Sequence, residues 1–107
     1  MEIPIVLNTS NGQVSFQTEK IKGKLDSLII DSDSRIEIII QSIHGYTIFH
    51  RKDFIGIEYF SPRNRISTPI ESIYDYLTFD KFNINEEIIL TIIGQKNQQV
   101  GFILRFD

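Results

Sequence analysis

The chain of 107 residues contains no cysteine, no tryptophan and no alanine, and only three prolines. Without cysteine it can form no disulfide, no thiolate metal site and no cysteine nucleophile. Alanine is the strongest helix former, whereas 22 residues are isoleucine and eight are phenylalanine. Because β-branched and aromatic side chains suit the pleated surface of a sheet, the composition argues against a mainly helical protein and favours an all-β one.

Strong charge of one sign and long apolar runs are absent as well. The 11 basic residues are scattered among 14 acidic ones, so the net charge is −3. Phosphate backbones are bound by clustered Lys and Arg, and we therefore expect no nucleic-acid partner. No apolar run approaches the ~20 residues that span a bilayer, which predicts no membrane partner. Glu2 stands where a signal peptide would carry basic residues, so we expect a soluble chain without a leader.

Alternation of apolar and polar residues with a period of two dominates the sequence and predicts strands. The predicted strands are residues 3–7, 14–18, 25–30, 35–41, 46–51, 54–60, 87–93 and 100–106, separated by predicted turns at 8–12, 31–34, 42–45 and 94–98 and by a loop at 61–68. Residues 73–79 are ambiguous between a strand and a short helix at 72–77. The spacing predicts one domain over residues 1–107, a single antiparallel β-sandwich (jelly-roll- or Ig-like) or a small barrel of seven to eight short strands.

Two further expectations concern the packing of this domain. One face of the predicted strands supplies the core, which we list as Phe16, Ile36, Ile38, Ile40, Ile48, Leu90, Ile92, Phe102 and Leu104. The first two predicted strands, 3–7 and 14–18, form either a hairpin through the turn at 8–12 or an extended N-terminal arm (residues 1–12) followed by a strand, and such an arm could pair with the edge of a neighbouring chain.

The sequence contains no complete metal-binding, nucleophile or phosphate-binding motif. His44 and His50 share a face of one predicted strand but would stand about 20 Å apart, too far to bind one metal ion. Asp31 and Asp33 resemble the start of a calcium loop, but that loop needs other residues than Ile36 and Ser42 at its sixth and twelfth positions. No Gly-x-Ser-x-Gly and no glycine-rich phosphate loop occurs. We therefore predict no catalytic residue, no metal, no cofactor and no enzymatic activity.

An excess of aromatic residues beside arginines points instead to a contact surface, because Tyr and Arg are enriched at protein interfaces. The candidate interface residues are Phe54, Tyr59, Phe60, Pro62, Arg63 and Arg65. In the alternative interpretation, Phe54 and Tyr59 belong to the core and the arginines are solvated.

Four motifs from His44 onward resemble a known group of proteins. They are HGYTIFHR at 44–51, F-x-G-x-x-Y-x-x-P-R from Phe54 to Arg63, I-x-L-x-I-x-G from Ile88 to Gly94, and N-x-x-V-x-x-x-L-R-F from Asn97 to Phe106. This order, over roughly residues 20–107, is similar to that of small all-β virion proteins of tailed bacteriophages. The resemblance implies a structural protein of the particle, such as a capsid decoration protein, head-fibre base or connector accessory.

The same resemblance implies localisation in the virion, contacts with capsid or connector proteins, a homo-oligomer, and no catalytic residue. The alternative function is a carbohydrate- or receptor-binding β-sandwich module. Such a module would stack sugars on Tyr46, Tyr59, Tyr74 or Tyr76.

Overall fold

Nine strands and no helix make up the described part of this computed structural model, which covers residues 1–69 and 75–107, with side chains described for 1–64 and 79–107. The strands are β1 (Glu2–Asn8), β2 (Gln13–Gln17), β3 (Ile21–Ser42), β4 (Thr47–Phe60), β5 (Asn64–Pro69), β6 (Asp75–Asp80), β7 (Phe82–Glu86), β8 (Ile88–Ile93) and β9 (Gln99–Phe106). Within the described residues no helix is long and apolar enough to cross a membrane.

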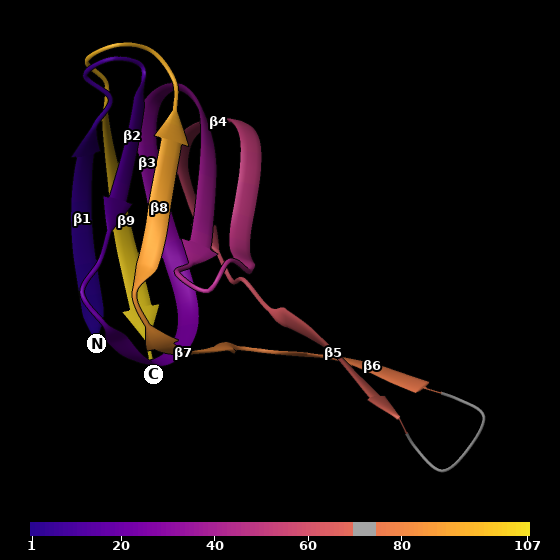
Figure 1. Ribbon diagram of the computed structural model, residues 1–107. Helices are drawn as coiled ribbons and strands as arrows, with labels where there is room; N and C mark the ends of the chain where they lie inside the picture. Colours follow the sequence, from indigo (N-terminus) through magenta and orange to yellow (C-terminus); the bar gives the residue numbers. More distant parts are fainter. Residues whose placement is uncertain (70–74) are drawn as a thin grey trace.

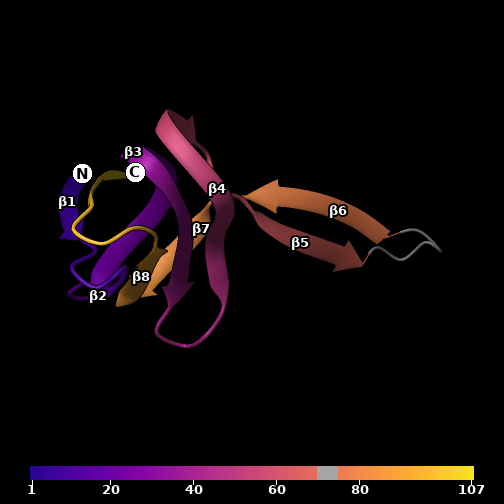
Figure 2. The same ribbon diagram turned by 90° about the horizontal axis from the view of Figure 1, so that it is seen from above.

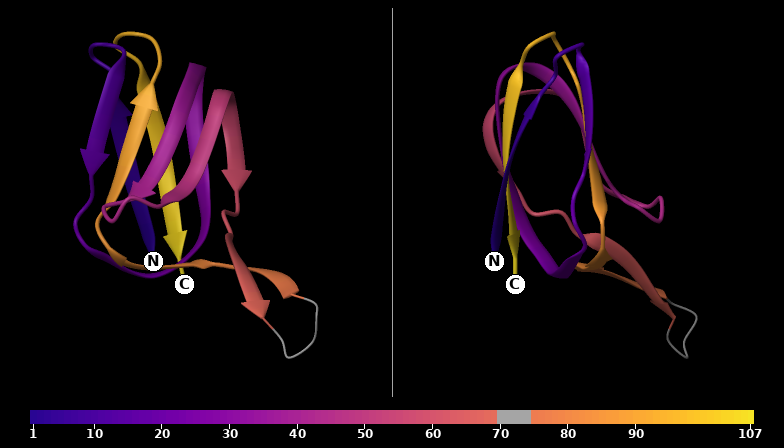
Figure 3. Two further views of the ribbon diagram at one scale, coloured as in Figure 1. Left: turned by 45° about the vertical axis from the view of Figure 1, so that its right-hand side comes forward. Right: turned by 60° about the vertical axis from the view of Figure 1, so that its left-hand side comes forward.

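Two antiparallel layers face each other, and both contain parts of β3 and β4 (Figures 1 and 3). The first half of β3 lies between β9 and the second half of β4, and β1 follows β9 at the edge. The second half of β3 lies between β8 and the first half of β4, and β2 follows β8. The strand order is β1-β9-β3-β8-β2, with β7 paired to the start of β3. The prediction of an all-β antiparallel sandwich is confirmed.

The space between the layers is filled almost entirely by Ile, Leu and Phe. Of the predicted core residues, eight are buried, among them Ile38, Leu90 and Leu104. Phe16 is the exception, with 40% of its surface exposed. Its side chain faces inward, beside Leu90 of β8, but β2 is an edge strand, so no further strand covers it.

A bend in β3 replaces the turn predicted at residues 31–34. Here β3 passes from one layer to the other, and its pairing with β4 shifts register between Ser32 and Ile36. The bend is braced from the β8–β9 turn, where the side-chain amide of Gln98 donates to Ser32 Oγ at 2.7 Å and to the Ser34 carbonyl at 3.0 Å. The four turn-favouring residues 31–34 therefore form a corner of the sandwich and not a turn. The chain can bend there within a strand because the side chain of Gln98 satisfies the Ser34 carbonyl.

Residues 1–12 form neither the predicted extended arm nor a hairpin with residues 14–18, because β2 pairs with β8. Glu2–Asn8 is strand β1, and it pairs with β9 of the same chain over its whole length. Its alternating side chains explain the difference, because Ile5 and Leu7 are buried in the core. Pro4 fits because an edge strand tolerates a residue without an N–H.

A second hairpin, β5–β6, projects from one end of the sandwich (Figures 1 and 2). Its strands pair from Asn64 with Asp80 to Pro69 with Asp75. The loop predicted at 61–68 is therefore strand from Asn64 onward. The helix considered for residues 72–77 begins outside the described residues, and residues 75–77 belong to β6.

Candidate functional site

The predicted interface residues do not form one surface. Phe54 is 2% exposed and packs in the core, and Pro62 is buried too. Phe60 is half-buried, with its ring centroid 4.8 Å from that of Phe49 and 5.9 Å from that of Phe54. Tyr59 is 57% exposed and remains available to a partner. The alternative interpretation is therefore right for Phe54 and does not hold for Tyr59.

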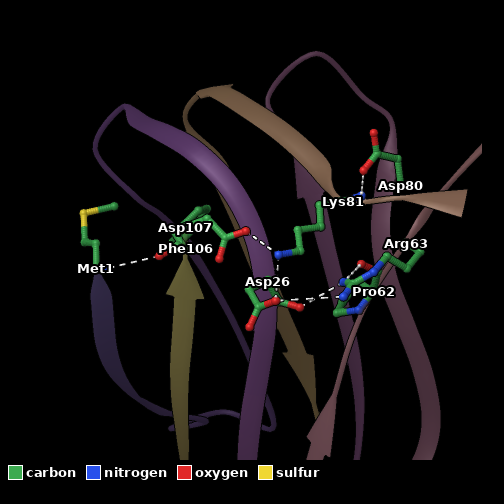
Figure 4. A network of polar contacts seen from close by, with 8 residues as sticks. All are labelled: Met1, Asp26, Pro62, Arg63, Asp80, Lys81, Phe106 and Asp107. Carbon is green, nitrogen blue, oxygen red and sulfur yellow. Dashed lines mark hydrogen bonds and ion pairs between the residues drawn. The ribbon is translucent and has the colours of Figure 1, made fainter.

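Arg63, one of the two arginines of this set, is bound to backbone carbonyls of its own chain. Arg63 Nη1 donates to the Asp26 and Pro62 carbonyl oxygens, each at 2.9 Å, so it fastens the chain locally (Figure 4). The side chain of Arg65 lies outside the described side chains. Most of the residues that the sequence predicts at an interface are thus used within the chain: Phe54, Phe60 and Pro62 pack internally and Arg63 binds the backbone.

Around Arg63 the polar network fastens the base of the β5–β6 hairpin to the sandwich (Figure 4). Lys81 lies at the end of β6 and bonds both to Asp26, with Nζ to Oδ1 at 3.1 Å, and to the carboxylate of Asp107. The hydrogen bond from Lys81 lowers the pKa of Asp26, and the bond to Asp107 raises the pKa of Lys81. All these groups are partly exposed, so solvent screens the pairs, and the network has a structural role at the hairpin base.

A buried carboxylate organises the turn between β3 and β4. Glu86 accepts hydrogen bonds from Ser42 Oγ and from the Tyr46 hydroxyl, and His44 Nε2 lies 3.3 Å from its Oε2. These bonds lower the pKa of Glu86, although its burial acts in the opposite direction. Burial and the bond to Glu86 raise the pKa of Tyr46.

This cluster contains a serine, a histidine and an acid but lacks the geometry of a nucleophile and its base. The hydroxyl of Ser42 donates to Glu86 and accepts from the backbone N–H of His44, at 3.0 Å, with no bond to the imidazole. A serine is activated by a base that accepts its proton, and Ser42 has no such bond to His44 here. The cluster therefore stabilises the Ser42–Tyr46 turn.

The other histidine, His50, is outside this cluster. Its Nε2 lies 2.7 Å from Oε2 of Glu37 on the neighbouring strand.

A group of exposed apolar residues lies on the outer face of the layer β1-β9-β3-β4, and we call it the outer apolar face. Its two rows follow from the strand register: Pro4, Ile103, Ile29 and Tyr59 in one, and Val6, Gly101, Asp31 and Ile57 in the next. Val6 is 69% exposed and Ile57 is 70% exposed. Gly101 has no side chain, and a shallow depression of about 270 Å³ lies over it between these residues.

Two acidic residues lie within and beside this face. Asp31 lies in the second row, and Asp33 lies beside it along β3, with both side chains exposed. Among the described side chains, neither carboxylate has a Lys, Arg or His within ion-pair distance. The sequence did contain this signal, because Val6, Ile29, Ile57 and Ile103 are apolar residues on the polar phase of their strands. Without the strand order, however, these four residues could not be placed together.

Comparisons with known proteins agree on the fold. No protein-family model and no curated protein sequence matches the chain. Among solved structures it is similar to the pre-peptidase C-terminal domain of a collagenase from Bacillus anthracis, with a TM-score of 0.52, 5% identity, and coverage of 100% of this chain and 90% of that one. At this identity the likeness shows the fold alone.

Two further solved structures are less similar. The mitogen of Yersinia pseudotuberculosis has a TM-score of 0.48 at 10% identity, covering 100% of this chain and 86% of that one. A family 29 carbohydrate-binding module has a TM-score of 0.37 at 13% identity, covering 94% of this chain and 65% of that one. The chain's own strand pairing makes it a β-sandwich module, and its role has to be argued from its own surface.

Proposed function

We propose that this module is a structural protein of a tailed-bacteriophage particle and binds another virion protein, of the capsid or connector, through its outer apolar face. The observation that carries the proposal is this face itself. Soluble monomers rarely leave a contiguous apolar patch across several strands open to water, and such patches mark contact surfaces. The setting in a phage particle rests on the resemblance in residues 20–107.

The chemistry of the face also describes its partner. Val6, Ile57 and Tyr59 offer exposed apolar side chains with one aromatic anchor, the composition typical of a contact surface. Asp31, which lies between Gly101 and Ile57 in the second row, and Asp33 favour a partner that brings Lys or Arg to them, since opposite charges steer the encounter and set the register. The partner surface is accordingly apolar, with basic groups opposite these two carboxylates.

The carbohydrate-binding alternative finds less support. A sugar platform needs flat aromatic faces with polar groups beside them. Tyr46 packs parallel to Phe82, with ring centroids 6.2 Å apart, and its hydroxyl is bound to Glu86. Tyr59 stands among aliphatic residues, and the side chains of Tyr74 and Tyr76 lie outside those described. Protein contact fits the outer apolar face better.

The test uses virions produced with and without this chain. Quantitative mass spectrometry of purified virions should find the chain in many copies, and virions without any copy would overturn the phage role. Purified chain is then added back to deficient particles, as wild type, Ile57→Lys or Ile43→Lys. Ile43 is the matched control, because it is also exposed but lies in the turn after the end of β3, whereas the face uses Ile29 and Asp31 in the first half of that strand.

We expect Ile57→Lys to weaken rebinding at least about tenfold, because it places a charge in the contact core, and Ile43→Lys to rebind as wild type. Equal rebinding of both variants would remove the outer apolar face from consideration. A glycan array probed with wild type and Tyr59→Ala should give no signal. Binding to a glycan that depends on Tyr59 would favour the alternative function.

A further inference from the structure

Among the described residues, β1, β2, β4 and β7 each have a free edge in the sheet of the sandwich. A free edge presents unpaired N–H and C=O groups that can pair with another strand, and proteins usually interrupt such edges. The edges of β1 and β4 are interrupted. Along the free edge of β1 one of the outward-directed residues is Pro4, which has no N–H. The edge of β4 is bent at Gly56, which has a φ of 102°.

The edge of β2 is uninterrupted. Gly94 N donates to Gly12 O at 2.8 Å and Thr18 N donates to Ile88 O at 2.9 Å, so even-numbered residues of this strand direct their backbone groups toward β8. By the alternation of an antiparallel ladder, the odd-numbered residues Gln13, Ser15 and Gln17 direct theirs outward. These five residues include no proline, no glycine, no charge and no positive φ.

An uncovered apolar groove accompanies this edge. It has a volume of about 370 Å³ and lies between β2 and β1, lined on the apolar side by Ile3, Ile5, Phe16 and Ile21. Phe16 faces inward yet is 40% exposed, and Val14 beside it is half-buried. A strand added to β2 would therefore gain backbone hydrogen bonds and would cover core side chains that this chain leaves open.

We propose that the occupant is β2 of a second copy, paired antiparallel about a two-fold axis through Ser15. The sequence Gln13-Val14-Ser15-Phe16-Gln17 is symmetric in its polar positions, so Gln13 faces Gln17 of the second copy and Ser15 faces its own counterpart. Each of these pairs exchanges two backbone hydrogen bonds. Val14 then lies opposite Phe16 at the closer, non-hydrogen-bonded positions, which is a favourable aromatic and β-branched pair.

The charges beside the strand are compatible with this pairing. Continuing the same register, Glu19 and Lys20 fall opposite Asn11 and Ser10 of the second copy, which are neutral. No like charges meet, whereas self-pairing of charged edges is repulsive. The inference does not depend on the proposed role in a virion, because it concerns the isolated chain.

Sedimentation of the purified full chain over a series of concentrations tests the pairing. Wild type should show a reversible monomer–dimer equilibrium. Ser15→Pro removes the central donor and should weaken dimerisation at least about tenfold. Asn8→Pro is the control: it removes an outward-directed N–H from the free edge of β1 and should leave the monomer–dimer equilibrium as in wild type.

A charge exchange tests the register without proline. Gln13→Lys/Gln17→Lys and Gln13→Glu/Gln17→Glu each place like charges opposite each other across the axis, so each variant alone should be monomeric. An equal mixture of the two should form a heterodimer that salt weakens. A monomeric wild type, an undiminished Ser15→Pro dimer, or a mixture that stays monomeric would each overturn the two-fold pairing.

Discussion

Tyr59 and Phe54 lie on the same strand, yet they have opposite environments, and this gives a direct prediction. Phe54→Ala removes a ring that is 2% exposed, so it should lower the free energy of unfolding by about 3–5 kcal/mol. Tyr59→Ala truncates an exposed side chain and should change this free energy by about 0.5 kcal/mol or less. Urea denaturation followed by circular dichroism measures both. Similar losses in the two variants would contradict the assigned burial.

Glu86 should make the stability depend on pH. Its pKa is lowered in the folded chain by the bonds from Ser42 and Tyr46, so the folded state binds its proton less readily than the unfolded state. The carboxylate therefore contributes stability above its ordinary pKa, and this contribution is lost as the pH falls through the lowered value.

The matching variant is Glu86→Gln, which keeps the shape and removes the charge. We expect it to be less stable than wild type by about 1–2 kcal/mol near neutral pH, because hydrogen bonds to a charged group are lost. The difference should shrink as the pH falls from about 7 to below the ordinary carboxyl pKa, because the unfolded wild type then takes up the proton more readily than the folded state. Urea midpoints at both pH values measure it, and a constant difference would show that the charge has no part.

At the scale of the elements, Gly56 makes the bend of β4 possible. Its φ of 102° is a conformation that residues with a Cβ rarely adopt. Gly56→Ala should therefore cost about 1–3 kcal/mol of stability, even though nothing lies within 4 Å of the added atom.

Gly101→Ala is the control for this bend. Gly101 is in ordinary strand conformation, and an added Cβ would meet only Asp31 Cβ at 3.9 Å. We expect its stability to stay within about 0.5 kcal/mol of wild type. Thermal unfolding compares the two variants, and equal effects would mean that the positive φ of Gly56 does not set the cost of its substitution.

The elements also show what the sequence could predict. Period-two alternation predicts most strands, because inward and outward side chains differ in polarity along β9 and along parts of β3. The residues around Ser32 predict a turn rather than a corner, since the Ser34 carbonyl there is satisfied by the side chain of Gln98, which is far along the chain. The outer apolar face escaped prediction for a similar reason. Its rows join residues from four strands, and only the strand order reveals them.

The whole molecule closes by pairing its first strand with its last. Met1 N donates to Phe106 O at 3.0 Å, and Phe106 N donates to Met1 O at 2.8 Å. Chains dominated by such distant pairings fold slowly, because loop entropy is lost before the contacts form. We expect refolding over milliseconds to seconds, measured by stopped-flow circular dichroism. Complete refolding within microseconds would contradict this.

The shared strands also determine how the module carries load. In a sandwich of two independent sheets, a sideways pull is resisted only by side chains that can slide past each other. Here β3 and β4 run through both layers, so the covalent backbone itself connects the sheet that bears the outer apolar face to the opposite sheet. Tension applied at that face passes along β3 through the corner at Ser32. The module is thereby built as a continuous tether, in which slippage of one layer against the other requires the long β3–β4 hairpin to be torn apart.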